Sequence, residues 1–266
     1  MSAITDVKRV VVKVGTSTLT YENGRLNLRR IESLVKVLSD IKNSGKEVVL
    51  VTSGAIGVGA GQLGLKERPR DIGGKQAAAA VGQCELMYTY DKQFAEYGHV
   101  TAQMLLTRDV VEDENRKRNV INTLHRLLEY GAVPIINEND TVATEEIEFG
   151  DNDTLSAMVA ELAGAELLVL LTDIDGLFDA DPRVHPDAQR IPVVEKIDES
   201  LLAIAGGAGS SRGTGGMLTK LYAARIASAA GIYTIIMDGA RPSRLYDVLD
   251  GQSVGTLFIP ENHAGQ

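Results

Sequence analysis

Short apolar runs alternate with segments of helical periodicity along this chain of 266 residues. The run from Val10 to Val14 is rich in valine and precedes Gly15, which is typical of a buried strand. Between Ile31 and Ile41, apolar residues recur every three or four positions, which indicates an amphipathic helix. The same patterns predict strands over 9–14, 47–51, 133–136, 166–171 and 232–237, and helices over 28–43, 75–97, 118–130, 153–163 and 218–230.

The predicted strands are mostly apolar throughout, rather than alternately apolar and polar. Such strands are buried on both faces, which favours a parallel sheet covered by helices on each side. The sequence therefore predicts an α/β fold, a three-layer α/β/α sandwich with a mainly parallel central sheet. The length suits one large domain or two lobes that share a cleft.

Composition narrows the classes of protein that fit. The net charge of −9 opposes nonspecific binding of nucleic acid, although a few lysines can still attract a small anion. Cys84 is the single cysteine, so no intrachain disulfide forms and a reducing, cytoplasmic location is expected. No basic and apolar leader begins the sequence, and no apolar run reaches the roughly 20 residues of a membrane helix. We expect neither a signal peptide nor a membrane partner.

Two clusters of amides and carboxylates lie beside apolar runs, at 137–141 and 149–156. Polar groups at the edge of a core can face a cleft, where Asn and Asp together bind an ammonium group and a carboxylate. The first interpretation is therefore an amino-acid site. The alternative is a pair of Asx-rich turns, which need no ligand.

Three glycine-bearing loops carry candidate chemistry. Lys13 stands near the end of a buried strand, where its ammonium needs an anion or a carboxylate, unless the side chain reaches solvent at the strand end. At 53–55, backbone amides before a helix could hold a carboxylate or phosphate. The formal dinucleotide motif that begins at Gly59 lies several residues past its strand, and we reject it.

The third loop covers 206–216 and leads into a helix that carries Lys220 in its first turn. Bare amides followed by a lysine suit phosphates, whereas a disordered surface loop is the alternative. Thr172 and Asp173 follow the most apolar strand, where open α/β sheets bind ligands. Their carboxylate and hydroxyl could contact a ribose or Mg²⁺, or the segment 175–176 could simply be a turn.

Six motifs occur here in one order, and together they resemble the amino acid kinase family over residues 8–259. They are Lys-x-Gly-Thr-Ser at 13–17, Thr-Ser-Gly-Ala at 52–55, Asn-Glu-Asn-Asp at 137–140, Phe-Gly-Asp-Asn-Asp at 149–153, Leu-Leu-Thr-Asp-Ile-Asp-Gly-Leu-Phe at 170–178, and Gly-Thr-Gly-Gly-Met-Leu-Thr-Lys at 213–220. The resemblance implies ATP-dependent phosphorylation of the L-glutamate side-chain carboxylate, the first step of proline biosynthesis.

The resemblance also implies a role for each motif residue. The catalytic set would be Lys13, Lys220 and Asp153. The glutamate-binding set would be Ser53, Gly54, Asn137, Asp140 and Asn152. The ATP-binding set would be Lys13, Thr172, Asp173, Thr214, Gly215, Gly216, Met217, Leu218, Thr219 and Lys220.

The same resemblance implies ATP and Mg²⁺ as cofactors, with no dedicated metal ligands among the protein residues. An N-terminal lobe, about 1–165, would bind the amino acid, and a C-terminal lobe, about 166–266, would bind ATP. A homo-oligomer (dimer or tetramer) and feedback inhibition by proline are further expectations. Many relatives carry an extra RNA-binding-like C-terminal domain, and we expect none in residues 1–266.

Two alternatives stay open. Another member of the family would act on N-acetylglutamate, carbamate, aspartate or UMP, although the carboxylate of Asp140 suits a free ammonium group. A non-catalytic amino-acid sensor on the same fold is the second. Such a sensor would be expected to lack a lysine or the aspartate of the catalytic set, and this chain has all three.

Overall fold

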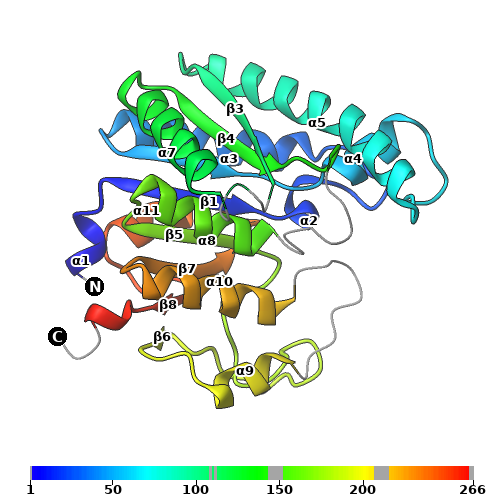
Figure 1. Cartoon of the computed structure of the whole chain (residues 1–266). Helices are drawn as coiled ribbons and strands as arrows, with labels where there is room; N and C mark the ends of the chain where they lie inside the picture. The colour runs from blue at the N-terminus through cyan, green and yellow to red at the C-terminus, as the bar shows by residue number, and fades with distance from the viewer. Residues whose placement is uncertain (1, 108–109, 111–112, 143–151, 207–215, 264–266) are drawn as a thin grey trace. The chain divides into compact units, whose positions relative to one another are not determined.

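The computed structural model describes residues 2–107, 110, 113–142, 152–206 and 216–263 (Figure 1). It divides into two compact units, one of Val14–Phe149 and the other of Met1–Lys13 with Gly150–Gln266. This division differs from the two lobes expected from the sequence, because the N-terminal strand and the helix after residue 151 group with the C-terminal unit. Which ligand each lobe binds stays a prediction.

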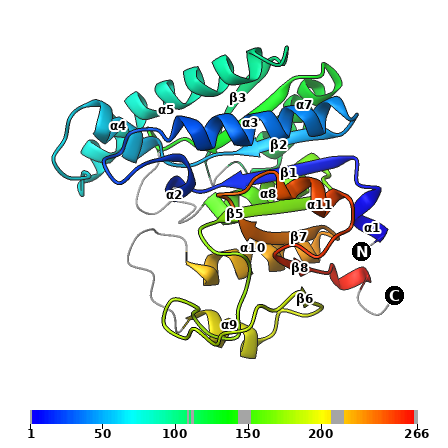
Figure 2. The ribbon, with the colours of Figure 1, turned by 180° about the vertical axis from the view of Figure 1, so that it is seen from behind.

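The unit Val14–Phe149 is built on three parallel strands in the order β3 (Thr101–Leu106), β4 (Val133–Glu138), β2 (Glu47–Val51). Helix α3 (Leu28–Asn43) packs against β2, and α7 (Glu114–Glu129) packs against β4. The two views place α3 and α7 on opposite faces of these strands (Figures 1 and 2). Helix α2 (Thr16–Leu19) lies beside α3, and α5 (Ile72–Ala95) contacts both α3 and β3.

Helix α4 (Ala55–Gln62) corrects the expectation of a glycine loop over 51–61. Its glycines disfavour a helix by propensity, yet they allow an unusually close approach to α5. A Cβ on Gly59 would lie 1.7 Å from the carbonyl oxygen of Ala78, and one on Gly82 would lie 1.9 Å from that of Ala55. Tertiary packing therefore outweighs local preference in this segment.

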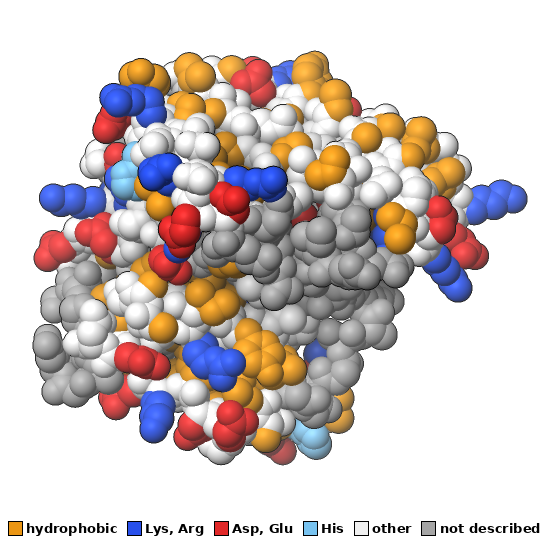
Figure 3. All heavy atoms as spheres, in the orientation of Figure 1, with side chains coloured by type: hydrophobic (Ala, Val, Ile, Leu, Met, Phe, Trp, Pro, Cys, Tyr) orange, Lys and Arg blue, Asp and Glu red, His pale blue; other side chains and the backbone are white. Residues whose placement is uncertain are grey.

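The outer face of α5 carries apolar side chains scattered among polar ones (Figure 3). Val81 and Tyr88 are 36% and 64% exposed, whereas Gln83 and Tyr90 are buried. The inner face of this helix thus combines small apolar residues with a few buried polar groups, and those groups contribute to the site described below.

The second unit is built on five strands in the order β1 (Arg9–Val14), β5 (Leu167–Thr172), β7 (Tyr233–Asp238), β8 (Thr256–Phe258), β6 (Val193–Val194). β5 and β7 are parallel, β7 and β8 are antiparallel, and β6 is parallel to β8. Helices α8 (Asn152–Ala163) and α10 (Met217–Ala229) cover one face, and α11 (Arg244–Leu249) covers the other (Figures 1 and 2). The remaining helices are α1 (Ser2–Thr5), α9 (Glu199–Gly206) and the 3-10 turn η1 (Glu261–His263).

The predicted α/β class with a mainly parallel sheet is confirmed in both units. The strand over 9–14 and the helix over 28–43 have their predicted bounds. Two helices begin earlier than predicted because of their caps: Asp71 accepts from Gly74 N ahead of α5, and Asp113 accepts from Arg116 N ahead of α7. Within the described part of the chain, no helix is long and apolar enough to cross a membrane.

Candidate functional site

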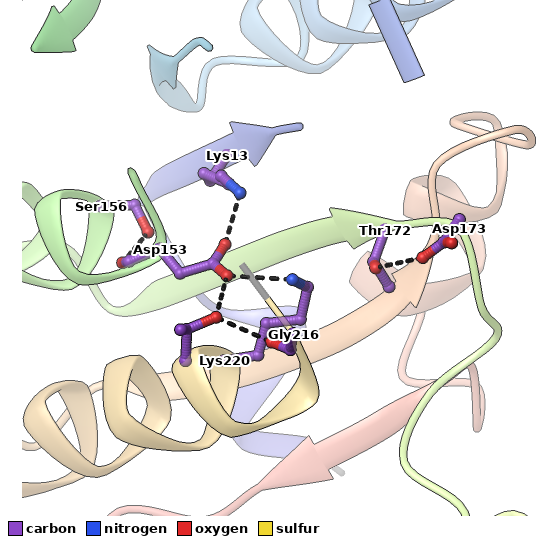
Figure 4. Close-up of polar contacts among 8 residues, drawn as sticks. Lys13, Asp153, Ser156, Thr172, Asp173, Gly216 and Lys220 are labelled. Atoms are coloured by element: carbon purple, nitrogen blue, oxygen red, sulfur yellow. Dashed lines mark hydrogen bonds and ion pairs between the residues drawn. The ribbon is translucent and has the colours of Figure 1, made fainter. Parts of the chain in front are cut away.

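Two lysines share one buried aspartate in the unit that holds β1, α8 and α10 (Figure 4). Lys13 Nζ lies 2.5 Å from Asp153 Oδ1, and Lys220 Nζ lies 2.9 Å from Asp153 Oδ2. Asp153 is fully buried and the two lysines are each 5% exposed. The interpretation of Lys13 as a lysine that reaches solvent at its strand end is therefore wrong.

The fold explains why these three residues meet. Lys13 is near the end of β1, Asp153 lies in the first turn of α8, and Lys220 lies in the first turn of α10. Helices α8 and α10 pack against each other, and β1 is next to β5 in the sheet. A carboxylate in the first turn of a helix also interacts favourably with the helix dipole.

Two hydroxyl groups hold the aspartate in place. Ser156 Oγ donates to the backbone oxygen of Asp153 at 2.6 Å. Thr219 Oγ1 lies 3.0 Å from Asp153 Oδ2 and 2.7 Å from the backbone oxygen of Gly216 (Figure 4). The hydroxyl of Ser156 thus holds the backbone of Asp153, and the first turn of α10 contacts its carboxylate.

The charge of this cluster indicates what it can bind. Two ammonium groups and one carboxylate lie together here, almost wholly removed from water. Ammonium groups removed from water interact strongly with an anion that comes close to them. The cluster is therefore suited to an anionic ligand with oxygen atoms, such as a phosphoryl group.

Thr172 and Asp173 follow at the carboxyl end of β5, as the sequence predicts. Thr172 Oγ1 donates to Asp173 Oδ1 at 3.1 Å, and Asp173 is exposed. Asp175 accepts from Arg244 Nη1 of α11 at 3.0 Å. Gly176 has φ of 121°, and the chain bends over 173–176. An exposed carboxylate beside a fixed turn is open to a ligand at this end of the strand.

The loop before α10 lies only partly within the described residues. Gly216 is the N-cap of α10 and has an extended backbone, and Met217, Leu218 and Thr219 follow in the first turn, half-buried. Of the ATP-binding set, Thr214 and Gly215 fall outside the described residues, as do residues 207–213 of the glycine loop. The choice between a phosphate loop and a disordered loop therefore stays open.

Ser53 and Gly54 form the link between β2 and α4 in the other unit. Gly54 has φ of 96°, a left-handed conformation that favours glycine, and it is the N-cap of α4. A Cβ at this position would also lie 3.2 Å from Cγ2 of Thr16. The backbone amides of the first turn of α4 thus follow Ser53, as an anion-binding helix N-terminus requires.

Asn137 and Asp140 lie at the end of β4 and just beyond it, within the same unit. Asn137 is 1% exposed, and its Nδ2 donates to Gln83 Oε1 at 2.8 Å. Thr141 Oγ1 donates to Asn139 Oδ1 at 2.6 Å, which is a local turn contact, and Asp140 is half-buried. The first polar cluster is therefore a turn that also directs one amide into the core.

Asn152 belongs to the other unit, where it begins α8 next to Asp153 and is half-buried. Residues 149–151 of the second polar cluster lie outside the described residues. Sequence reasoning missed Gln83 and Tyr90, which make buried hydrogen bonds from α5 to Asn137 and Thr52. The sequence feature that could have indicated them is the presence of polar side chains on the inner face of an alanine-rich helix.

Among the residues that the structure describes, no three His, Cys, Asp or Glu side chains are grouped as metal ligands. This observation concerns only an all-protein site. A cation carried by the phosphates of a nucleotide needs few protein ligands.

Comparison with known proteins gives one matching family model and several relatives above 50% identity. The model of the amino acid kinase family matches residues 8–238. A protein of Clostridium perfringens named glutamate 5-kinase is 56% identical over 97% of this chain and 97% of its own length. One of Clostridium tetani with the same name is 56% identical over 95% of both. The glutamate 5-kinase of Caldanaerobacter subterraneus is 54% identical over 95% of this chain but only 68% of its own length.

Solved structures of lower identity share the fold. An isopentenyl phosphate kinase of T. acidophilum, solved as a product complex, has a TM-score of 0.65 at 19% identity and covers 94% of this chain and 99% of its own. A UMP kinase of Bacillus anthracis has a TM-score of 0.66 at 16% identity and covers 96% and 97%. At such identities the likeness concerns the fold alone.

Proposed function

Because this chain belongs to the amino acid kinase family, we propose that it transfers the γ-phosphoryl group of ATP to the side-chain carboxylate of L-glutamate. The product would be L-glutamyl 5-phosphate, as for a glutamate 5-kinase of proline biosynthesis. The observation that carries the chemistry is the buried pair Lys13 and Lys220 on Asp153. The identity of 56% to proteins named glutamate 5-kinase supports the choice of acceptor.

Phosphoryl transfer requires alignment and positive charge more than covalent help from the protein. The bond from the γ-phosphorus to the glutamate carboxylate oxygen forms as the bond to the β,γ-bridging oxygen breaks, and ADP leaves. Lys13 and Lys220 neutralise the phosphoryl oxygens during this transfer. Asp153 holds the two ammonium groups at fixed positions and limits their mutual repulsion.

No general base is needed for this acceptor. A glutamate side chain has an unperturbed pKa of about 4.3 and is ionised at neutral pH. The nucleophilic oxygen therefore carries its negative charge before the reaction begins. A minimum set of two lysines and one organising aspartate satisfies the chemistry, and the proposed mechanism assigns no step to a histidine.

We assign glutamate binding to the two loops at the ends of β2 and β4 and to the first residue of α8. The carboxylate of Asp140 would receive the α-ammonium group, and the amides after Gly54 would receive a carboxylate at the N-terminus of α4. Ser53, Asn137 and Asn152 complete the set. The support for this assignment is the burial of Ser53 and Asn137 at the strand ends together with the family motifs.

ATP is assigned to Thr172, Asp173 and the segment from Gly216 to Lys220, and the assignment of Thr214 and Gly215 rests on the family motif alone. Mg²⁺, when bound, supplies further neutralisation of the phosphate oxygens. Both carboxylate oxygens of Asp153 lie against ammonium groups, so Mg²⁺ would be held by the nucleotide, by water and by the exposed carboxylate of Asp173.

A homo-oligomer, inhibition by proline and a cytoplasmic location complete the proposal. All three rest on the family or on composition. Light scattering of the purified protein tests the first, and proline titration in the activity assay tests the second. A single species of monomer mass, or activity unchanged by proline, would remove that part of the proposal.

The function is tested by coupled ADP release with ATP and Mg²⁺ against glutamate, N-acetylglutamate, aspartate, carbamate and UMP. We expect turnover with glutamate and little with the others. Turnover with another acceptor but not with glutamate would replace the substrate and keep the kinase, whereas no turnover with any acceptor would favour the non-catalytic alternative.

A further inference from the structure

Helix α5 connects to the ends of β2 and β4 through two buried side-chain hydrogen bonds. Asn137 Nδ2 donates to Gln83 Oε1 at 2.8 Å, and the hydroxyl of Tyr90 lies 2.9 Å from Oγ1 of Thr52. Gln83 and Tyr90 are seven residues apart, which is two helical turns, so both project from the inner face of α5. Helix α5 thus contacts the ends of both strands whose following loops are assigned to glutamate.

The contact at Gln83 lies where α4 also packs on α5. Gly82, the preceding residue, is so close to the first residue of α4 that a Cβ would lie 1.9 Å from Ala55 O. The start of α4, which follows Ser53 and Gly54, is therefore seated beside Gln83 on α5. In this way α5 positions the N-terminus of α4 by backbone contact and the end of β4 by a side-chain hydrogen bond.

Gln83 satisfies only part of its own hydrogen-bonding capacity. Its Oε1 accepts from Asn137, whereas its Nε2 is buried and has no acceptor among the residues that the structure describes. A buried donor without an acceptor destabilises a fold. Gln83 therefore supplies an acceptor to the buried amide of Asn137 while its own Nε2 has none among the described residues.

The hydrogen bond also restrains the amide of Asn137. Its Nδ2 donates to Gln83 Oε1, so rotation of this side chain would break a buried contact. Asn137 is 1% exposed and lies in the last two residues of β4, three positions before Asp140. A change in the Asn137 amide would be transmitted to the loop that carries Asp140.

We propose that Gln83 is a positioning residue for the acceptor site, acting through its hydrogen bond to Asn137. This inference rests on the proposed function, which places Asn137 and Asp140 in the glutamate site. Gln83 sets the geometry of the acceptor loop and takes no part in phosphoryl transfer. Its loss should therefore weaken acceptor binding and leave ATP binding and the chemical step nearly unchanged.

The variant that tests this is Gln83→Met, which keeps the length of the side chain and removes both amide groups. We expect the KM for glutamate to rise about tenfold, the size of one lost buried hydrogen bond, with kcat and the KM for ATP within about twofold. We also expect only a small change in Tm, because removal of the unsatisfied Nε2 offsets the loss of the acceptor for Asn137 Nδ2. The matched control is Gln93→Met, the same change on α5 at a half-exposed position, which should alter neither KM nor kcat.

A double-mutant cycle separates positioning from a general loss of packing. In an Asn137→Ala background, Gln83→Met should raise the KM for glutamate by less than about twofold, because its partner is already absent. Multiplication of the two single effects would overturn the proposal. An unchanged KM in the single variant, or a joint fall of Tm, kcat and affinity for ATP, would overturn it as well.

Failure of the proposed function can be distinguished from failure of the inference about Gln83. If the parent protein phosphorylates a different acceptor in the panel, the assignment of glutamate fails. The same variants are then assayed with that acceptor, and a selective rise in its KM supports Gln83 as a positioning residue while an unchanged KM rejects it.

Discussion

Lys220 Nζ lies 2.9 Å from Asp153 Oδ2, on a carboxylate whose other oxygen is bound by Lys13. The aspartate is fully buried, so the attraction between these groups is weakly screened by water. Two cations are thereby held close together in a place where they would otherwise repel each other. This arrangement determines how the site should respond to substitution.

Lys220→Ala should lower kcat by about 10²- to 10³-fold and change the KM for glutamate little, because its contact strengthens as charge develops in the transition state. Steady-state kinetics of ADP release measure both constants. Lys92→Ala, at an exposed position of α5, is the control. Equal kcat in Lys220→Ala and the parent would remove Lys220 from the mechanism.

Asp153→Asn should lower both activity and the free energy of unfolding. The substitution leaves two buried ammonium groups without their counter-charge, and breaking a buried pair in this way costs about 3–5 kcal/mol. Denaturant titration measures the loss. For comparison, Glu129→Gln breaks the exposed Arg126–Glu129 pair and should change stability by at most about 1 kcal/mol. Similar small losses for both variants would contradict the importance assigned to the buried cluster.

Asp140→Ala should raise the KM for glutamate by about tenfold or more and have a smaller effect on kcat, since a charged hydrogen bond to the ammonium group is lost. Kinetics at saturating ATP isolate this effect. Asp187→Ala, an exposed aspartate of the other unit, serves as the control. An unchanged KM would exclude contact between Asp140 and the substrate.

Gly54→Ala should lower the free energy of unfolding by about 1–3 kcal/mol and also weaken glutamate binding, because Gly54 combines φ of 96° with a close neighbour in Thr16. Gly45→Ala is a matched control, since Gly45 has φ of 95° but no atom within 4 Å of an added Cβ. It should share the backbone cost and leave the KM for glutamate unchanged. If both variants alter KM alike, the loop at Gly54 has no particular role in binding.

Periodicity and motifs predicted much of the fold and part of the site. Strand β1 and helix α3 have their expected bounds, because each has a strong local pattern. Strand β3 was not predicted, since Gln103 is exposed and interrupts its apolar run. Helix α4 has no periodic pattern that predicts its bounds, since its glycines are favourable only where α5 lies close against them.

The sequence by itself determined the fold class, the family and the identity of the three charged residues, because hydrophobic periodicity and motif order are local properties of the chain. Only the tertiary structure decided that Lys220 and Asp153, 67 residues apart, share a hydrogen bond, and that Asn137 meets Gln83 across 54 residues. Such contacts depend on how helices pack on a sheet, and no local pattern encodes that packing. The physical reason is burial. A polar group removed from water is stable only with a hydrogen-bond partner, and that partner can come from any part of the chain that the fold places beside it.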